Sequence, residues 1–267
     1  MKKLFCLFLL LLSGAAHAAV QSKVVNYQYQ GVTMKGYLAW DDSFSGKRPG
    51  ILVVHEWWGL NDYARRRAEQ LAKIGYVAFA SDMYGEGKST EHPEEAKAMV
   101  QEVMKNLPFM LGRAEAALKV LRGNENVDSS RIAAIGYCFG GAVVLNLAYS
   151  GADLAAVASF HGALPVPQST QNIKARILIL QGAEDPFVSQ ETIQQLQAAL
   201  NAGNVKYKFV SYPGAVHGFT VPGSEKRGMK GVAYNAEADQ KSWQEMQLLF
   251  QEALGLKLRR SPTGGGL

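Results

Sequence analysis

Five nearly continuous apolar runs, separated by stretches with helical periodicity, constrain the fold of this chain more than any other feature. The runs are GILVVHE, YVAFASD, RIAAIGY, LAAVASFHG and ARILILQG, which begin at residues 50, 76, 131, 154 and 175. Apolar residues without alternation indicate strands that are buried on both faces of a sheet. Helical patterns cover residues 63–74, 93–121, 139–148, 190–202 and 236–254. This alternation predicts the α/β class: a doubly wound, mostly parallel sheet with helices on both faces.

Alternating stretches extend the predicted sheet at its two ends. KVVNYQY and MKGYLAW, residues 23–29 and 34–40, alternate polar and apolar side chains and predict an antiparallel pair. VKYKFVSY, residues 205–212, predicts one more strand before the last helix. Pro108 is expected to kink or split the long central helix. The side chains expected on the buried side of the last helix are Trp243, Met246, Leu248 and Phe250.

The first 18 residues have the composition of a secretory signal peptide. MKKLFCLFLLLLSGAAHA begins with lysines, continues with an apolar stretch shorter than the ~20 residues of a membrane span, and ends in small residues. We therefore expect cleavage after residue 18, export to the periplasm, and no membrane association afterwards. Residues 19–258 are expected to form a single domain, and the glycine-rich residues 259–267 to be disordered.

The charge pattern favours a small-molecule partner over nucleic acid. The net charge of +5 is spread along the chain, and its densest cluster, RRRAE at residues 65–69, is interpreted as the solvated face of a helix. The sequence shows no histidine–carboxylate or cysteine cluster with the spacing of metal ligands, so we expect no metal and no cofactor. A monomer is expected.

Cleavage of the signal peptide would remove Cys6 and leave Cys138 as the single cysteine of the mature chain. It lies in the segment GYCFGG, between a predicted strand and a predicted helix. A nucleophile flanked by glycines at such a junction is typical of a sharp, strained turn, in which Gly136 and Gly140 relieve crowding. The dipoles at the N-terminus of the following helix favour a thiolate. A lone cysteine can equally be a small buried hydrophobic residue, so its role depends on which titratable side chains lie beside it.

Three further titratable side chains follow predicted strands, and the carboxyl ends of parallel strands share one edge of a sheet. Glu56, Asp185 and His217 occupy these positions. His217 is the best candidate base for Cys138, because it alone among the histidines follows the last predicted strand. Asp185 is expected to orient it, although spacing does not exclude Glu184. The chain order nucleophile, acid, histidine is that of α/β-hydrolases.

This set of residues resembles the dienelactone hydrolase family of the α/β-hydrolases. The resemblance runs from GILVVHEWWGLND through YVAFASDMYG, IGYCFGG and GAEDP to AVHGF. It implies an α/β-hydrolase fold and cleavage of an ester or lactone through an acyl-thioester on Cys138. It further implies that His217 is the general base and then acid, and that Asp185 orients it. The resemblance also implies that Glu56, at the position of the family's extra glutamate, holds the resting thiol neutral and helps to ionise it when substrate arrives.

The resemblance also implies an oxyanion hole, formed by the backbone N–H groups of Trp57 and Phe139. The aromatic residues expected to wall the substrate pocket are Trp57, Trp58, Tyr84, Phe139 and Phe219. A plainer interpretation of HEWWGLND makes the tryptophans core or lid residues and Glu56 a helix cap.

The sequence departs from the family where the family holds a substrate carboxylate with two arginines. Those positions carry Glu86 and Val221 here, and neither side chain can pair with a carboxylate. Lys88, Lys226 and Arg227 lie nearby and are candidates to replace the arginines. We expect a neutral ester or lactone as substrate rather than dienelactone.

Two other functions stay open at this point. The chain could be a non-catalytic, ligand-binding member of the fold. It could also be a thiol redox sensor, which would need a second molecule to supply the resolving thiol, because the mature chain has only Cys138.

Overall fold

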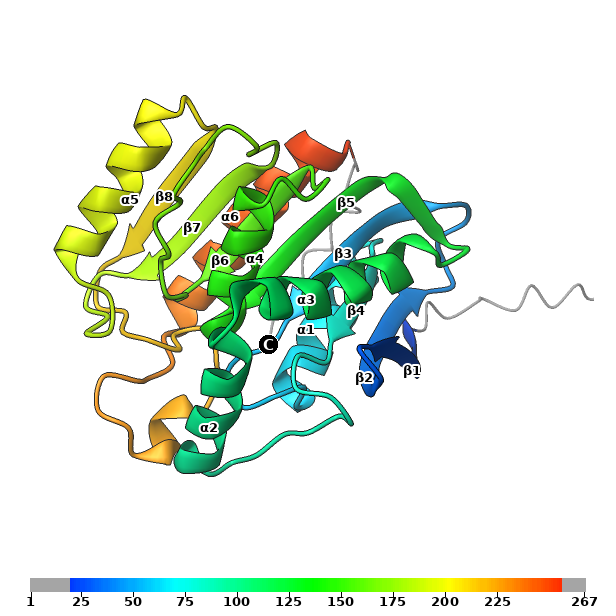
Figure 1. Ribbon diagram of the computed structural model, residues 1–267, viewed down its shortest axis with the longest axis horizontal. Helices are drawn as coiled ribbons and strands as arrows, with labels where there is room; N and C mark the ends of the chain where they lie inside the picture. The colour runs from blue at the N-terminus through cyan, green and yellow to red at the C-terminus, as the bar shows by residue number, and fades with distance from the viewer. Residues whose placement is uncertain (1–19, 256–267) are drawn as a thin grey trace, which may run out of the picture.

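The computed structural model describes residues 20–255, in which helices cover an eight-stranded sheet (Figure 1). The expected signal peptide and the whole of the expected C-terminal tail, residues 259–267, lie outside these residues. The strands are β1 (Val20–Tyr29), β2 (Val32–Asp41), β3 (Arg48–Val54), β4 (Val77–Ser81), β5 (Val127–Tyr137), β6 (Ala156–Phe160), β7 (Arg176–Gly182) and β8 (Tyr207–Tyr212). The α-helices are α1 (Asp62–Lys73), α2 (Pro93–Met104), α3 (Leu107–Arg122), α4 (Phe139–Tyr149), α5 (Gln190–Ala202) and α6 (Ala236–Leu254).

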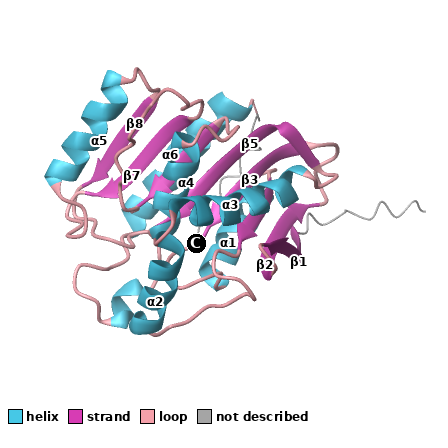
Figure 2. Cartoon of the chain, viewed as in Figure 1, coloured by secondary structure: helices cyan, strands magenta, loops and turns pink. Residues whose placement is uncertain are grey.

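The sheet has the strand order β1-β2-β4-β3-β5-β6-β7-β8. Strands β3 to β8 pair in parallel, whereas β1 with β2 and β2 with β4 pair antiparallel. From β3 onward strands alternate with helices (Figure 2), except that α2 and α3 are consecutive and β7 follows β6 without a helix between them. The prediction of a mostly parallel sheet that begins with an antiparallel pair is confirmed. Within residues 20–255, no helix has the length and apolar character needed to span a membrane.

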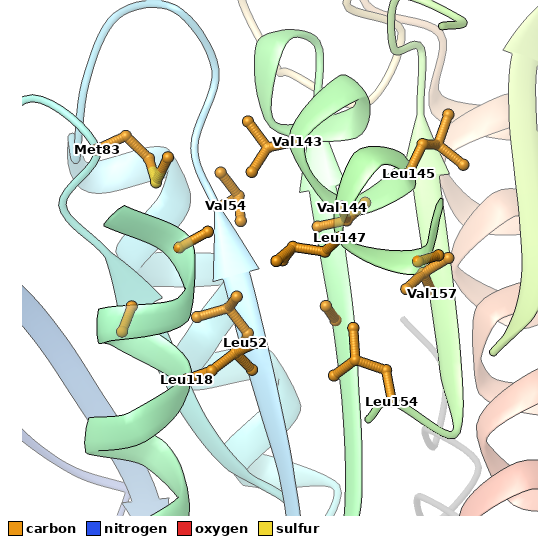
Figure 3. Packing of buried hydrophobic residues seen from close by; sticks show 14 of the residues in the cluster. Leu52, Val54, Met83, Leu118, Val143, Val144, Leu145, Leu147, Leu154 and Val157 are labelled. Carbon is orange, nitrogen blue, oxygen red and sulfur yellow. The ribbon is translucent and has the colours of Figure 1, made fainter. Parts of the chain in front are cut away.

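Helices cover both faces of the sheet, which confirms the doubly wound arrangement. Leu52 and Val54 of β3 belong to the core layer beneath α2, α3, α4 and α5, whereas Ile51 and Val53 belong to the layer beneath α1 and α6. Figure 3 shows the first layer, with Leu52 and Val54 beside side chains of the covering helices. Because successive residues of a strand point to opposite faces, a strand buried on both sides needs an unbroken apolar run.

The long central helix is split, as Pro108 predicts. Helix α2 ends at Met104, and α3 begins at Leu107 with Pro108 in its first turn. The side chain of Asn106 accepts a hydrogen bond from the N–H of Phe109 at 3.2 Å, which caps α3.

One prediction for the last helix is wrong. Met246 and Phe250 are buried and Trp243 packs against the same layer, but Leu248 is 53% exposed. Leu248 lies two positions from both Met246 and Phe250, which turns its side chain by about 200° to the opposite face of the helix.

The interpretation of the RRRAE cluster as a solvated face is wrong for its third arginine. Arg67 is 6% exposed, and its guanidinium lies over the rings of Tyr63 and Trp243 at 5.3 and 5.2 Å. It donates to the carbonyl oxygen of Thr220 at 2.8 Å and forms an ion pair with Asp239 of α6. Arg67 therefore joins α1, the last helix and the loop after β8.

Candidate active site

Cys138 lies at a sharp turn between β5 and α4, as the sequence predicts. Its backbone has φ 53° and ψ −114°, a left-handed conformation that is strained for a residue with a side chain. The N–H of Cys138 donates to the carbonyl oxygen of Phe160 at 3.0 Å, which helps to hold the turn. A Cβ atom on Gly136 would lie 2.0 Å from the carbonyl oxygen of Gly140, so the turn requires glycine there.

His217 and Asp185 meet beside this turn. His217 Nδ1 lies 2.9 Å from Asp185 Oδ2, and the two side chains are 14% and 1% exposed. Gln181 Nε2 donates to the same carboxylate oxygen at 2.7 Å, and the N–H of Phe187 donates to Asp185 Oδ1 at 2.9 Å. Three donors thus fix the carboxylate, which in turn fixes the ring of His217.

Glu184, the alternative partner that the sequence left open, is directed elsewhere. Its Oε1 accepts a hydrogen bond from the N–H of Gly214 at 3.1 Å, at the exposed side of the loop. The geometry therefore assigns the histidine contact to Asp185.

When the sulfur of Cys138 is ionised, the electrostatic environment of His217 favours the imidazolium. Burial lowers its pKa, but the charge of Cys138 and hydrogen bonds to Asp185 and to Cys138 outweigh burial and raise the pKa to about 10. Because Nδ1 binds Asp185, Nε2 is the ring nitrogen that remains to exchange a proton with Cys138. A protonated imidazole in this position stabilises negative charge on the sulfur of Cys138.

The loop that carries His217 is anchored by a buried threonine. Thr220 Oγ1 lies 2.5 Å from the hydroxyl of Tyr63 and 2.8 Å from Nε2 of His161. The ring of His161 packs edge-on against His217 with their centroids 5.3 Å apart. The position of His217 is thus tied to α1 and to the end of β6.

Glu56 is a buried carboxyl group on the same side of the sheet. It is 6% exposed, and its Oε2 has no hydrogen-bond partner among the described residues. Burial raises the pKa of Glu56, and the positive charges of His217, Arg227 and Arg67 oppose this effect. Glu56 does not cap α1, because the side chain of Asn61 takes that role. An unpaired buried carboxyl is costly, which is common at functional sites.

A cavity of about 570 Å³ joins these groups. Its lining residues are Glu56, Trp57, Trp58, Val100, Cys138, Phe139, Ala163, Phe187, Val188, His217, Ser224, Arg227, Met229, Lys230 and Val232. Glu56, Cys138 and His217 therefore open onto one space, and Asp185 lies behind His217. The structure brings together all four titratable residues that the sequence singles out.

Two of the aromatic residues expected in the pocket wall are placed elsewhere. Phe219 is fully buried and packs against Tyr212 in the layer beneath α6. Tyr84 lies behind the wall, where its hydroxyl donates to the carbonyl oxygen of Trp57 at 2.8 Å and its ring stacks on Phe139. Both follow the strand ends as expected, but their side chains point into the core.

Several residues of the wall were not anticipated. The additional apolar side chains are Val100, Phe187, Val188, Met229 and Val232. Among the three cationic candidates near the missing arginines, Arg227 lines the cavity and Lys88 and Lys226 do not. Arg227 ends the short 3₁₀ helix η1 (Ser224–Arg227), and its guanidinium lies 4.2 Å from the ring centroid of Trp58.

The two backbone segments expected to form the oxyanion hole lie side by side. Phe139 is the first residue of α4, so its N–H has no acceptor within the helix. A Cβ atom on Gly140 would lie 2.3 Å from the carbonyl oxygen of Val54, which shows how closely α4 approaches the end of β3. Trp57 follows that end and, like Phe139, lines the cavity beside Cys138.

Residues 20–255 contain no group of three His, Cys, Asp or Glu side chains arranged to hold a metal ion.

The sequence matches one family model over most of its length. The model of the dienelactone hydrolase family matches residues 34–254. A protein of Synechocystis sp. with the provisional name carboxymethylenebutenolidase is 30% identical over 255 residues, which cover 88% of this chain and 98% of that protein.

Solved structures agree with this match. A dienelactone hydrolase-like promiscuous phosphotriesterase from metagenomic libraries is 36% identical with a TM-score of 0.85, covering 89% of this chain and 100% of that one. An α/β hydrolase from a Medee basin deep-sea metagenome library is 21% identical with a TM-score of 0.66, covering 88% and 99% of the two chains. The fold is therefore the α/β-hydrolase fold. The chain is a hydrolase and belongs to the dienelactone hydrolase family.

Proposed function

We propose that this hydrolase cleaves a carboxylic ester or lactone with Cys138 as its nucleophile, through an acyl-thioester intermediate. The observation that carries the proposal is that Cys138 and His217, which is hydrogen-bonded to Asp185, line one cavity, where the charge of Cys138 raises the pKa of His217. A nucleophile, a base and a group that orients the base are the minimum machinery for acyl transfer.

The proposed reaction has two halves. His217 takes the thiol proton, and the sulfur of Cys138 attacks the carbonyl carbon. The N–H groups of Trp57 and Phe139 stabilise the negative charge that forms on the carbonyl oxygen. Collapse of this intermediate expels the alcohol oxygen, which receives the proton from His217. A water molecule, deprotonated by His217, then attacks the thioester, and the acid leaves as Cys138 regains its proton.

The acyl-thioester is directly testable. Rapid acid quenching during turnover of p-nitrophenyl acetate is expected to leave one acetyl group on the peptide that contains Cys138, detected by mass spectrometry. The variant Cys138→Ala, treated in the same way, should carry no acetyl group at that peptide. Turnover with the acetyl group on another residue, or with no covalent adduct under single-turnover conditions, would contradict the proposal.

The shape and charge of the cavity support a neutral substrate. Its wall is mainly aromatic and aliphatic, and although Lys230 also lines it, Glu56 would repel a carboxylate placed next to Cys138. Arg227 is stacked on Trp58, and its positive charge already acts on Glu56. We propose that the substrate is a neutral ester or lactone and not dienelactone.

A panel of substrates tests this choice. We expect kcat/KM for uncharged p-nitrophenyl esters and simple lactones to exceed that for dienelactone at neutral pH. Thioesters and a phosphotriester belong in the same panel, because a similar solved structure is named a promiscuous phosphotriesterase. Much faster hydrolysis of dienelactone than of the neutral esters would show that the charge argument is wrong.

Glu56 is proposed to limit the thiolate in the resting site. A carboxylate accepts a hydrogen bond from the neutral thiol and disfavours a second negative charge beside it. The substitution Glu56→Gln removes that charge, so inactivation of Cys138 by hydrogen peroxide is expected to become several-fold faster. The measurement is the second-order rate of inactivation at neutral pH. An unchanged or slower rate would exclude this role for Glu56.

The redox-sensor function makes a different prediction for the same thiol. A sensor would carry a persistent mixed disulfide on Cys138 in protein taken from the periplasm, whereas a hydrolase would carry a free thiol that can be alkylated.

We also propose that residues 1–18 direct export and are removed, and that the remaining chain acts as a single-domain monomer. N-terminal sequencing of the exported protein tests the cleavage site.

A further inference from the structure

His55 is a fully buried imidazole that neither half of the proposed reaction uses. It directly follows β3, with Nδ1 2.5 Å from the carbonyl oxygen of Glu56 and Nε2 3.2 Å from the backbone nitrogen of Met83. The N–H of Met83 can only donate, so Nε2 is the acceptor. The proton of a neutral His55 is then on Nδ1, which donates to the carbonyl of Glu56.

The surroundings of His55 favour this neutral form. Burial lowers the pKa of His55, and the hydrogen bond to Glu56 and the charge of Asp82 only oppose that effect. Each ring nitrogen therefore has one fixed partner, and the ring has one tautomer.

The carbonyl that His55 holds belongs to the peptide group that supplies the N–H of Trp57. In a planar trans peptide, the C=O and the following N–H point in opposite directions. The carbonyl of Glu56 faces His55 in the interior, so the N–H of Trp57 faces away from His55, on the side where Trp57 and Cys138 line the cavity. A second donor to this carbonyl, the N–H of Gly59, is more distant at 3.3 Å.

The next peptide is held in the same way. The hydroxyl of Tyr84 donates to the carbonyl oxygen of Trp57 at 2.8 Å. The ring of Tyr84 packs against His55 at 5.0 Å and stacks on Phe139 at 6.0 Å. His55 and Tyr84 thus fix two successive carbonyls of one oxyanion-hole segment and also contact Phe139, which supplies the other donor.

We infer that His55 is a positioning residue for the oxyanion hole: its Nδ1–H holds the carbonyl of Glu56 and thereby aims the N–H of Trp57 at the substrate oxygen. This inference rests on the proposed acyl transfer at Cys138. Without the Nδ1–H of His55, the carbonyl of Glu56 keeps the longer hydrogen bond from the N–H of Gly59. The peptide between Glu56 and Trp57 can then rotate, and the N–H of Trp57 no longer points at the substrate oxygen.

Two substitutions separate the donor from the rest of the imidazole. His55→Leu removes both hydrogen bonds, whereas His55→Asn places an amide N–H near the position of Nδ1 and leaves only the N–H of Met83 without its acceptor. The two variants therefore share the loss at Met83 and differ in the donor to Glu56. Removal of one oxyanion-hole donor outright lowers kcat by about 10²–10³-fold, so we expect His55→Leu to lower kcat by about 10- to 100-fold with little change in KM.

His55→Asn is expected to recover most of that loss. Alkylation of Cys138 by iodoacetamide provides the second readout, because displacement of iodide needs the thiolate and no oxyanion hole. Its rate should be the same in the wild type, His55→Leu and His55→Asn. Thermal unfolding of each variant verifies that the measured protein is folded.

The outcomes are distinct. Equal kcat in all three folded proteins, or an equal loss in both variants, overturns the inference. A fall in alkylation that matches the fall in kcat also overturns it, because the damage then lies at the thiol. Failure of the proposed function has another signature, since ester turnover is then absent from the wild type or survives in Cys138→Ala, and the inference fails with it.

Discussion

Cys138→Ala is expected to lower kcat/KM for p-nitrophenyl esters by at least ~10⁴-fold while the protein stays folded. Alanine removes the attacking atom, and the catalysis that remains comes from the oxyanion hole and from binding. The strained backbone at residue 138, with φ 53°, is equally unfavourable for cysteine and for alanine. The stability of the variant should therefore be close to that of the wild type.

A variant at the other end of the same helix is the matched control. Ser150 is the C-cap of α4 and donates to the carbonyl oxygen of Leu147 at 2.8 Å, far along the helix from the cavity. Ser150→Ala should keep wild-type kcat/KM. If Cys138→Ala kept more than a tenth of the wild-type turnover, the nucleophile would have to be another group. If neither the wild type nor Cys138→Ala hydrolysed any ester, and both bound ligand equally well, the chain would be a non-catalytic member of its family.

A large loss of stability, about 3 kcal/mol of unfolding free energy, is expected from Gly140→Ala. The added Cβ would lie 2.3 Å from the carbonyl oxygen of Val54 and 2.7 Å from that of His55. Both atoms belong to the backbone of the segment at the end of β3, so no side chain can rotate to make room. Helix α4 must move away from β3, which also separates the N–H groups of Phe139 and Trp57.

Chemical denaturation measures this loss of unfolding free energy. The kcat of the Gly140→Ala variant, corrected for the fraction that is folded, should also be lower than that of the wild type, because the N–H groups of Phe139 and Trp57 are separated. Gly123→Ala is the control, because Gly123 has φ −77° at the end of α3 and a Cβ there would have its nearest contact at 3.3 Å. Its stability should change by less than about 1 kcal/mol. Equal stabilities for the two variants would show that the approach of α4 to β3 is not tight.

The sequence was sufficient to predict the parts of the fold that depend on local pattern. Ile51 and Leu52 face opposite core layers. Because β3 is buried on both faces, its sequence is an unbroken apolar run, and that run predicts the burial. The convergence of Cys138 and His217 was also predictable, because both follow parallel strands and such strands end at one edge of the sheet.

Other features depend on tertiary contacts that no local pattern records. Arg67 looks like a surface arginine, and only the arrival of Asp239 and Thr220 from distant segments makes its burial favourable. The wall residues Phe187 and Met229 lie in loops, whose paths are set by the elements they join. For Tyr84, the position after β4 was visible in the sequence, but the direction of its hydroxyl toward Trp57 was not.

The contacts of Arg67 link the proposed base to the far end of the chain. Arg67 binds both Asp239 in α6 and the carbonyl of Thr220, and Thr220 lies three residues after His217 in the same loop. Local opening of the first turn of α6, which carries Asp239, would therefore release one side of the support beneath the imidazole while the strands remain paired. Opening of that first turn would therefore disturb turnover at a lower cost than global unfolding, without changing any residue of the cavity wall.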